Sequence, residues 1–159
     1  MNIVTIDKKS DEKFLRKPVS DFDFSRHSKK EIKELILNMK LAMQKVNGIG
    51  LSSNQIGLEC RIFIAKPMKK FYVVFNPKII KSGEETTSLE EGCLSVPGIY
   101  GEVQRPDKIT VMGFDESGKK IKFKINGLLA RVFQHEIDHL NGGLFIDKAK
   151  ELYKMEKNV

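Results

Sequence analysis

The amino-acid sequence predicts a single α+β domain in which small antiparallel or mixed sheets pack around a central helix. The chain has 159 residues, a length that suits one hydrophobic core and leaves no room for two. Apolar residues recur at helical intervals in two segments, 28–47 and 127–140, and strand-like segments lie between them. This order of helix, several strands and helix differs from the strict strand–helix alternation of a parallel sheet. We therefore expect residues 1–159 to form one domain.

The first predicted helix begins at Ser28. Ser28 and Glu31 have the spacing of a capping box, in which each side chain bonds the other residue's backbone N–H. Apolar residues follow at helical intervals: Ile32, Leu35, Ile36, Met39, Met43 and Val46. Asn47 and Gly48 are typical of a helix end. The next segment, 48–57, is rich in glycine and is expected to be irregular.

Two pairs of strands are predicted in the middle of the chain. The first pair covers residues 61–65 and 71–75, with Asn76-Pro77 interrupting the second strand and residues 78–80 extending it. The second pair covers residues 109–114 and 120–125, which flank a hairpin turn at 115–118. Apolar residues alternate with lysines in the last strand, so this sheet is expected to have one solvent-exposed face.

The second predicted helix covers residues 127–140, with Asn126 as its N-cap. Asn141, Gly142 and Gly143 are typical of its end. Its buried side is marked by Leu129, Val132, Phe133, Ile137 and Leu140. The basic C-terminal tail, residues 147–159, is expected to form a short helix that frays at its end.

Charge and hydropathy limit the partners. The net charge of +7 raises the question of an anionic partner. Lysines and acids alternate along most of the chain, and neither an Arg-rich block nor a tryptophan is present, so no sequence-specific nucleic-acid binding is expected. The chain shows no signal-like apolar start, and its apolar runs are too short to span a bilayer. We expect a cytoplasmic monomer without membrane contact.

Residues 135–139 form the motif His-Glu-x-x-His. Positions i and i+4 of a helix share a face, so His135 and His139 can ligate one metal ion. Glu136 lies about 100° further round the helix, where it can accept a proton from a water molecule beside the ion. Asp138 is interpreted as an outer or surface carboxylate, and His27 as an exposed residue. The pattern indicates a metal-dependent hydrolase. It predicts that the central helix binds the metal.

A catalytic site of this kind needs a third protein ligand and an open position. Cys93 is favoured, because the glycine before it lets the backbone approach closely, and Asp147 is an alternative. A rival interpretation is a closed structural zinc site that adds Cys60. Cys60 and Cys93 are 33 positions apart, however, unlike the short cysteine spacing of zinc fingers. Cys60 otherwise fits the role of a small buried apolar residue in a β-rich segment.

Three segments together resemble the peptide deformylase family in its compact bacterial type. They are Gly48–Gln55, Glu91–Ser95 and Gln134–His139, which occur in the family's order within a resemblance that extends from about Asp7 to Asp147. One departure is visible: Ser52 and Ser53 stand where the family usually has two alanines. The resemblance implies removal of the N-formyl group from the N-terminal methionine of newly synthesised polypeptides, with release of formate.

The resemblance also implies roles for individual residues. Cys93, His135 and His139 would bind one divalent metal ion, Fe(II) in the native protein, with zinc, nickel or cobalt as substitutes. Glu136 would be the general base and acid, and Gln55 and the backbone N–H of Leu94 would stabilise the oxyanion. Glu91 resembles the family's buried acid, with Arg105 as its candidate partner.

The expected substrates are nascent peptides that begin with formyl-methionine. Ile49, Gly50, Leu89 and Leu128 are candidate walls of the methionine pocket, although the apolar side chains among them suit core packing equally well. Arg131 could lie at the rim of that pocket or face solvent. The lysines of the tail suggest contact with the ribosome. Two other classes of function remain open: a different metal-dependent amidase or peptidase, and a structural metal module or binder of anionic surfaces.

Overall fold

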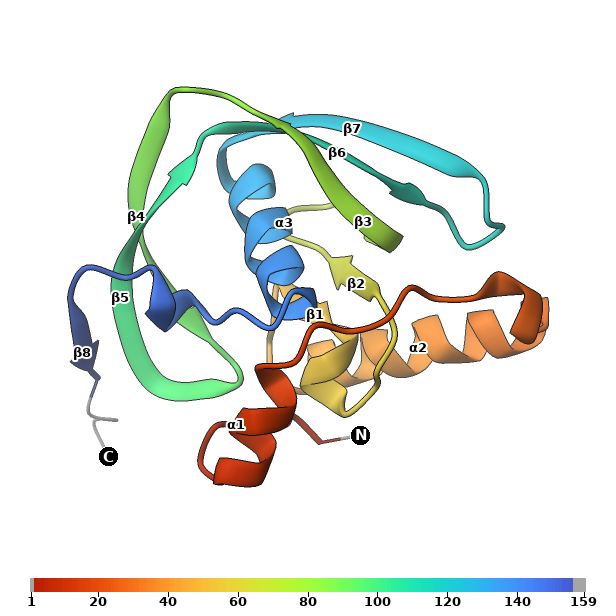
Figure 1. Ribbon diagram of the computed structural model, residues 1–159, viewed down its shortest axis with the longest axis horizontal. Coiled ribbons are helices and arrows are strands. Elements are labelled where there is room, and N and C mark those ends of the chain that lie inside the picture. Colours follow the sequence, from red (N-terminus) through yellow and green to blue (C-terminus); the bar gives the residue numbers. More distant parts are fainter. Residues whose placement is uncertain (1, 156–159) are drawn as a thin grey trace.

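A computed structural model describes residues 2–155 and places helix α3 (Gly127–Leu140) between two antiparallel sheets (Figure 1). The larger sheet has the strand order β1 (Gly50–Ser52), β2 (Ile62–Ala65), β3 (Tyr72–Ser82), β6 (Lys108–Phe114) and β7 (Lys120–Asn126). The smaller sheet has the order β4 (Thr86–Cys93), β5 (Val96–Pro106) and β8 (Leu152–Lys154). The helices that complete the fold are α1 (Lys9–Leu15), α2 (Lys29–Lys45) and the 3₁₀ turns η1 (Phe24–Arg26), η2 (Ser53–Ile56) and η3 (Phe145–Asp147). The predicted α+β class is confirmed.

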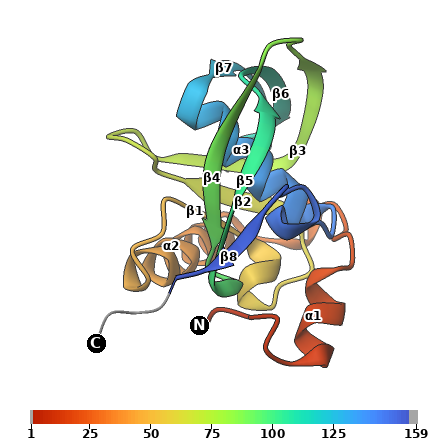
Figure 2. The same cartoon turned by 90° about the vertical axis from the view of Figure 1, so that its left-hand side faces the viewer.

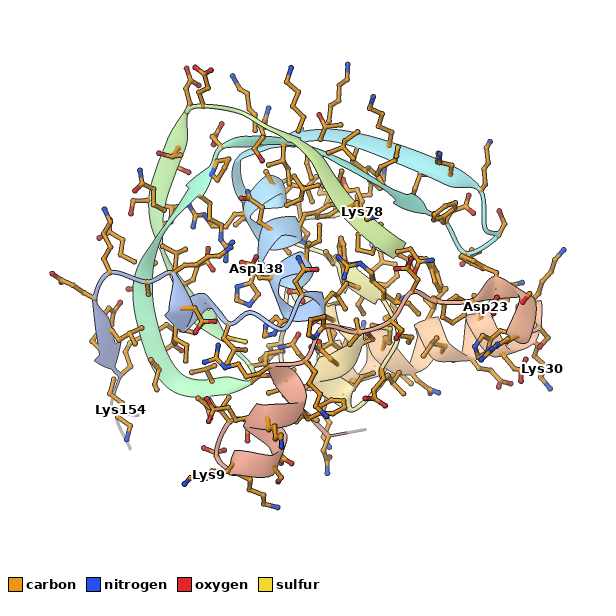
Figure 3. All side chains as sticks on the ribbon, in the orientation of Figure 1. Lys9, Asp23, Lys30, Lys78, Asp138 and Lys154 are labelled. Atoms are coloured by element: carbon orange, nitrogen blue, oxygen red, sulfur yellow. The ribbon has the colours of Figure 1, made fainter. Side chains whose placement is uncertain are left out.

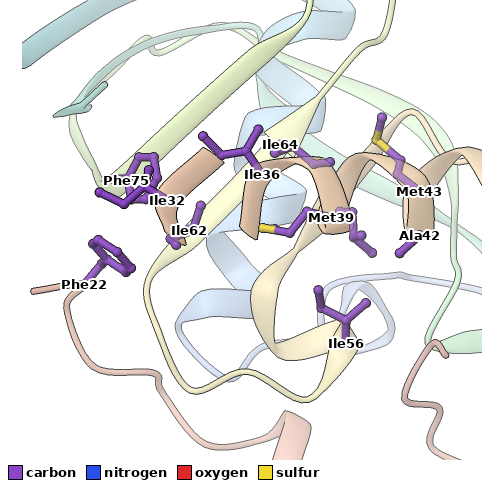
Figure 4. Packing of buried hydrophobic residues seen from close by; sticks show 11 residues of the cluster. Phe22, Ile32, Ile36, Met39, Ala42, Met43, Ile56, Ile62, Ile64 and Phe75 are labelled. Atoms are coloured by element: carbon purple, nitrogen blue, oxygen red, sulfur yellow. The ribbon is translucent and has the colours of Figure 1, made fainter. Parts of the chain in front are cut away.

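Strand β2 is buried on both faces and divides the core into two clusters. Ile62 and Ile64 pack with the apolar face of α2, as Figure 4 shows for Ile36 and Met39. Phe63 points to the opposite side and packs against α3. Because successive strand residues point to opposite faces, one short strand contacts both helices.

Helix α3 is buried along most of its length. Phe133 makes edge-to-face contacts with Phe63, at a centroid distance of 4.8 Å, and with Tyr72 and Phe123, each at 5.5 Å. Such aromatic pairs contribute roughly 0.5–1.5 kcal/mol each beyond the burial of their area. These contacts hold the helix firmly against the larger sheet, and the site residues that it carries are therefore held in place.

The first helix forms as the sequence predicts. The Ser28 hydroxyl accepts a hydrogen bond from the Glu31 N–H at 3.2 Å, and the Glu31 carboxylate accepts one from the Ser28 N–H at 2.7 Å. The hairpin β6–β7 and the helix at 127–140 are confirmed as well. Asn126 precedes that helix, but its side chain makes no capping hydrogen bond.

Several local predictions were incomplete or wrong. Segment 48–57, expected to be irregular, contains β1 and η2. The predicted interruption at Asn76-Pro77 is confirmed, by contrast: β3 has a register shift between Phe75 and Lys78, where Asn76 has a φ of 47° and its side chain bonds both backbone groups of Phe22. The sequence analysis did not identify α1 or the hairpin β4–β5, which stands beside α3 in Figure 2.

The prediction of a helical tail was wrong. After η3 the chain forms β8, which pairs with β5 from Ile99 to Gly101 and closes one edge of the smaller sheet. Residues 156–159, the remainder of the predicted tail, lie outside the described residues. Tyr153 stacks on Tyr100 with ring centroids 6.3 Å apart. Pairing with the edge of β5 satisfies backbone groups that an isolated short helix would leave exposed to water.

None of the helices in the described part of the chain has both the length and the apolar character needed to cross a bilayer.

Candidate metal centre and active site

Two elements bring three metal-ligating side chains together. His135 and His139 lie one turn apart on α3, with ring centroids 5.0 Å apart. Cys93 is the last residue of β4, and its Sγ lies 3.1 Å from His139 Nε2. One ligand atom from each of the three residues lies within 4.8 Å of the others. One sulfur and two imidazole nitrogens at these distances can surround a single divalent ion.

The end of the β4–β5 hairpin presents Cys93 to the helix. A register shift between Gly92 and Cys93 precedes the two-residue connection to β5. A Cβ atom on Gly92 would lie 2.6 Å from the ring of Tyr100, so a side chain at this position would displace the aromatic ring. The Ser95 N–H donates to Cys93 Sγ at 3.4 Å, and the Gln55 amide reaches the same sulfur at 3.6 Å.

The charges of the site favour a thiolate at Cys93. Burial by itself would raise the pKa of the Cys93 thiol, but the two imidazoles outweigh burial and hold this pKa well below its usual range. His139 Nδ1 and Glu136 Oε2 are buried without a hydrogen-bond partner. A thiolate, two imidazoles and a neighbouring carboxylate oxygen with unused acceptor capacity fit a divalent ion together with a water molecule.

Glu136 is buried beside the three ligands. Burial raises its pKa above the usual range, against the opposing effect of the two histidines. A Cβ atom on Gly50 would lie 2.3 Å from Glu136 Oε1, so only glycine leaves room for the carboxylate. A carboxyl group with a raised pKa holds a proton more readily than an exposed one, which suits a general base that later acts as a general acid.

Gln55 and Leu94 lie on either side of Cys93. Gln55 belongs to η2 and is 2% exposed, and its amide Nε2 donates to Ser95 Oγ at 3.2 Å. Leu94 follows Cys93 in the hairpin connection and lines the same pocket. A side-chain amide and a backbone N–H in these places are suitable donors for a developing oxyanion.

Glu91 is held by two arginines and one histidine. Arg105 donates to both carboxylate oxygens, at 2.6 and 2.9 Å, and Arg131 donates to Oε1 at 2.7 Å. His135 Nδ1 lies 3.0 Å from Oε2, which leaves its Nε2 for the cluster. Burial alone would raise the pKa of Glu91, but the hydrogen bonds from His135 and Arg105 and the Arg105 charge hold it well below its usual range.

The same network decides between the two alternatives for Arg131 and places Asp138. Arg131 borders the pocket and does not face solvent: it is buried and also donates to the backbone oxygens of Val103 and Thr87. Asp138, labelled in Figure 3, accepts hydrogen bonds from Arg105 and Lys148, each at 2.8 Å. Asp138 therefore lies behind the ligands, as part of the ion-pair network.

A pocket of about 490 Å³ opens onto these groups. Its walls include the candidate substrate-binding residues Ile49, Gly50 and Leu128, together with Val132. Leu89 does not line it; this side chain lies on β4 and is 51% exposed. The apolar side chains of Ile49 and Leu128 are about half exposed, at 49% and 47%, so they do not belong to the closed core.

The alternative ligands lie elsewhere. Asp147 accepts hydrogen bonds from Arg16 and from the Leu144 N–H and is not part of the cluster. Cys60 pairs through its backbone with Ser20 and packs at the margin of the α2 cluster. Within residues 2–155, Cys93, His135 and His139 form the one group of three or more such side chains close enough to hold an ion.

The pairing of Glu91 with Arg105 was predicted from the sequence, but two other hydrogen-bonding partners of the site were missed. Ser95 contacts both Gln55 and Cys93, and Arg131 anchors Glu91. The position of Ser95 directly after the predicted ligand pair Cys93–Leu94 was a usable signal. No local signal linked Arg131 to a carboxylate 40 positions away.

Comparison with known proteins gives one consistent result. A sequence profile described as polypeptide deformylase matches residues 1–155. A peptide deformylase from Carboxydothermus hydrogenoformans is 47% identical over 122 residues, which cover 76% of this chain and 79% of the relative. One from Desulforudis audaxviator is 40% identical over 128 residues, which cover 80% of this chain and 83% of the relative.

Solved structures agree with this result. The crystal structure of peptide deformylase from Thermotoga maritima superposes with a TM-score of 0.81 at 36% identity, covering 94% of this chain and 97% of the other. The enzyme from Synechococcus elongatus in complex with actinonin gives a TM-score of 0.84 at 33% identity, covering 94% of this chain and 78% of the other. The chain therefore belongs to the peptide deformylase family.

Proposed function

We propose that this chain is a metal-dependent hydrolase that removes the N-formyl group from the N-terminal methionine of newly synthesised polypeptides and releases formate. The observation that carries the proposal is the cluster of Cys93, His135 and His139 beside the buried Glu136, at the inner end of a pocket, in a member of the peptide deformylase family. Residues 1–159 act as a single catalytic domain in this proposal.

Cys93, His135 and His139 hold one divalent ion, with Fe(II) as the native ion and zinc, nickel or cobalt as substitutes. A thiolate with two imidazoles is a donor set that several borderline metals accept, which supports this range. When bound there, the ion lowers the pKa of a water molecule and polarises the formyl oxygen.

The residues around the ion have separate roles in the reaction. Glu136 takes a proton from the attacking water as its oxygen bonds to the formyl carbon, and then passes the proton to the amine nitrogen as the C–N bond breaks. Gln55 and the Leu94 N–H donate to the oxyanion that forms on the formyl oxygen; a donor in this role contributes about 3 kcal/mol. Glu91, held by Arg105 and Arg131, keeps the His135 ring oriented.

The pocket receives the methionine side chain. Ile49, Gly50 and Leu128 form its walls, whereas Leu89 lies outside it on β4. An apolar site with few polar groups suits an unbranched, uncharged side chain. The Arg131 guanidinium is engaged by Glu91, Val103 and Thr87, so it is not free to attract an acidic side chain.

The cellular setting is also part of the proposal. The protein acts as a cytoplasmic monomer on nascent formyl-methionyl peptides, and its basic tail contacts the ribosome. The described part of the tail, residues 147–155, contains β8, and its Lys150 and Lys154 are exposed. Co-sedimentation with ribosomes that weakens as salt rises is expected. Binding that is absent at low salt, or that salt does not change, contradicts the tail contact.

The function is tested by formate release from a formyl-methionyl tripeptide, beside the N-acetylated peptide as control. We expect turnover of the formylated peptide alone, because an acetyl methyl group adds bulk at the reacting carbon. Equal turnover of both peptides would identify a less selective amidase, and cleavage of an internal peptide bond would identify a peptidase.

Glu136→Gln tests the proposed mechanism. The variant keeps the shape of the side chain but cannot accept the proton, so we expect hydrolysis to fall by roughly a hundredfold or more. Metal content by elemental analysis and the thermal transition should remain those of the unaltered protein. Retained hydrolysis would remove Glu136 from the mechanism and favour a structural metal module.

A further inference from the structure

Ser52 and Ser53 are the two positions at which the first motif departs from the family pattern. Both side chains are fully buried, with exposed fractions of 0%. Ser52 ends β1 and Ser53 begins η2. A buried hydroxyl has to find a hydrogen-bond partner, and the two serines find theirs in different parts of the molecule.

Ser52 bonds to Gln55 with two groups. Its backbone N–H donates to Gln55 Oε1 at 3.0 Å, and its hydroxyl contacts the same oxygen at 3.0 Å. A backbone N–H can only donate, so the amide atom that faces Ser52 has to be the oxygen. The hydroxyl, lying against an acceptor, donates its proton to it. Two donors therefore fix which end of the Gln55 amide points away from Ser52.

The other end of the amide points into the active site. Gln55 Nε2 donates to Ser95 Oγ at 3.2 Å and reaches Cys93 Sγ at 3.6 Å. The Ser52 hydroxyl therefore bonds the far end of the side-chain amide whose nitrogen the proposed function assigns to the oxyanion.

Ser53 gives a contrasting case one residue later. Its hydroxyl donates to the backbone carbonyl of Cys60, so it ties η2 to the segment that enters β2. Neither Ser53 nor Cys60 lines the active-site pocket. The two adjacent buried hydroxyls can therefore be compared directly: that of Ser52 bonds the side-chain amide of Gln55 in the active site, and that of Ser53 bonds a backbone carbonyl outside it.

We propose that Ser52 is a positioning residue for deformylation, whose hydroxyl holds the Gln55 amide with its nitrogen directed at the developing oxyanion. The inference rests on the proposed function. Ser52 does not line the pocket, so it acts through Gln55 and not on the substrate. With the hydroxyl removed, the backbone N–H alone orients the amide, and part of the preorganisation is lost.

The expected effect falls on the chemical step. Ser52→Ala should lower kcat by roughly three- to tenfold, which corresponds to the loss of one ordinary hydrogen bond, and leave KM within about twofold. Ser53→Ala, matched in size and burial, should leave both parameters within about twofold. An equal loss of kcat in both variants, or unchanged kcat in Ser52→Ala, would overturn the proposal.

A double-mutant cycle identifies the route of the effect. If Ser52 acts through Gln55, then Ser52→Ala should change kcat by less than about twofold in a Gln55→Ala background. An undiminished loss in that background would show that Ser52 acts on another group and would overturn the proposal. The reactions use nickel-loaded full-length protein and a formyl-methionyl tripeptide.

A measurement without turnover separates this inference from the proposed function. The side-chain amide protons of Gln55, assigned by their absence in Gln55→Ala, should exchange with solvent faster in Ser52→Ala than in the unaltered protein and Ser53→Ala. Unchanged exchange would overturn the positioning role even with an active enzyme. Failure of the unaltered protein to release formate would count against the proposed function, while the exchange result would still report on the amide.

Discussion

Cys93 and Cys60 occupy two neighbourhoods that differ in the charge around the thiol. Both thiols are partly buried. Burial raises the pKa of Cys60, and its hydrogen bond with Ser53 only reduces that rise. At Cys93 the imidazoles of His135 and His139 outweigh burial and hold the pKa well below its usual range. The comparison teaches that the two neighbouring imidazoles, and not the degree of burial, set the difference in pKa between the two thiols.

An arginine lies in each neighbourhood, partly buried at Arg61 and fully buried at Arg105, and the two differ in the charge of their partners. Arg61, next to Cys60, donates to the backbone oxygens of Pro77 and Leu140 and to the side chain of Asn141. Burial lowers its pKa. For Arg105, in the Cys93 neighbourhood, burial acts the same way, but bonds to Glu91 and the charges of Glu91 and Asp138 raise the pKa. One arginine is satisfied by neutral oxygens and the other by carboxylates.

The largest effect is expected from replacing each of the two cysteines in turn by alanine. Cys93→Ala should abolish stoichiometric metal binding and reduce formate release to background, because the site loses its anionic ligand. Cys60→Ala should retain the metal and the activity. Elemental analysis after dialysis, with both variants prepared in parallel, measures this. Metal loss in Cys60→Ala alone would revive the closed site with both cysteines.

Breaking the carboxylate network should cost the most stability. In Glu91→Gln, Arg131 loses its carboxylate partner in a buried place, and the free energy of unfolding of the metal-free protein should fall by about 3 to 5 kcal/mol. Urea denaturation measures the difference. Glu90→Gln, at the adjacent exposed position of β4, is the control and should stay within about 0.5 kcal/mol. Equal stability of both variants would contradict the network's role.

Lowering the pH should weaken the same carboxylate network gradually, because Glu91 becomes protonated. The pKa of Glu91 is lower in the folded than in the unfolded protein, so its stabilising contribution is complete above the unfolded value of about 4.3 and is lost as pH falls. The difference in unfolding free energy between the unaltered protein and Glu91→Gln should therefore narrow below roughly pH 5. A constant difference down to strongly acidic pH would show that Glu91 keeps its ordinary pKa in the fold.

The smallest effect is expected in the Cys60 neighbourhood. Arg61→Met keeps the apolar stem and removes donors to neutral oxygens, so unfolding free energy should fall by about 1 to 2 kcal/mol. No carboxylate is left alone by this change. Arg26→Met, at a side chain that is 81% exposed, is the matched control. A loss as large as that of Glu91→Gln would erase the distinction between the two arginine environments.

The sequence predicted those elements whose apolar pattern is local. Helices α2 and α3 carry apolar residues at helical intervals, and β7 alternates lysine with apolar side chains, so all three were found. Strands β4 and β5 were missed because their buried positions include Glu91, Gly101 and Arg105. These residues do not give the alternation of apolar and polar side chains that predicts a strand. The tail was assigned to a helix because its pairing partner lies about 50 positions earlier.

The site residues also fall into two groups, those predictable from a local sequence pattern and those placed by contacts between distant segments. The spacing of His135, Glu136 and His139 is a local pattern, and one helix places all three. The approach of Cys93 depends on the hairpin register, and the ion pair and hydrogen bonds of Arg131 join it to residues 28 to 44 positions away. The interpretation of Cys93 as third ligand therefore relied on the choice among few candidates and on family resemblance.

The cluster also joins two separate layers, because Cys93 comes from the smaller sheet while His135 and His139 come from the helix packed on the larger one. An ion bound across this junction stabilises the folded state by an amount that rises with the logarithm of its free concentration, to about 4 kcal/mol at a thousand times its dissociation constant. Resistance to unfolding and proteolysis would then follow the supply of metal. The lifetime of the protein in a cell, and not only its turnover number, becomes a function of metal availability.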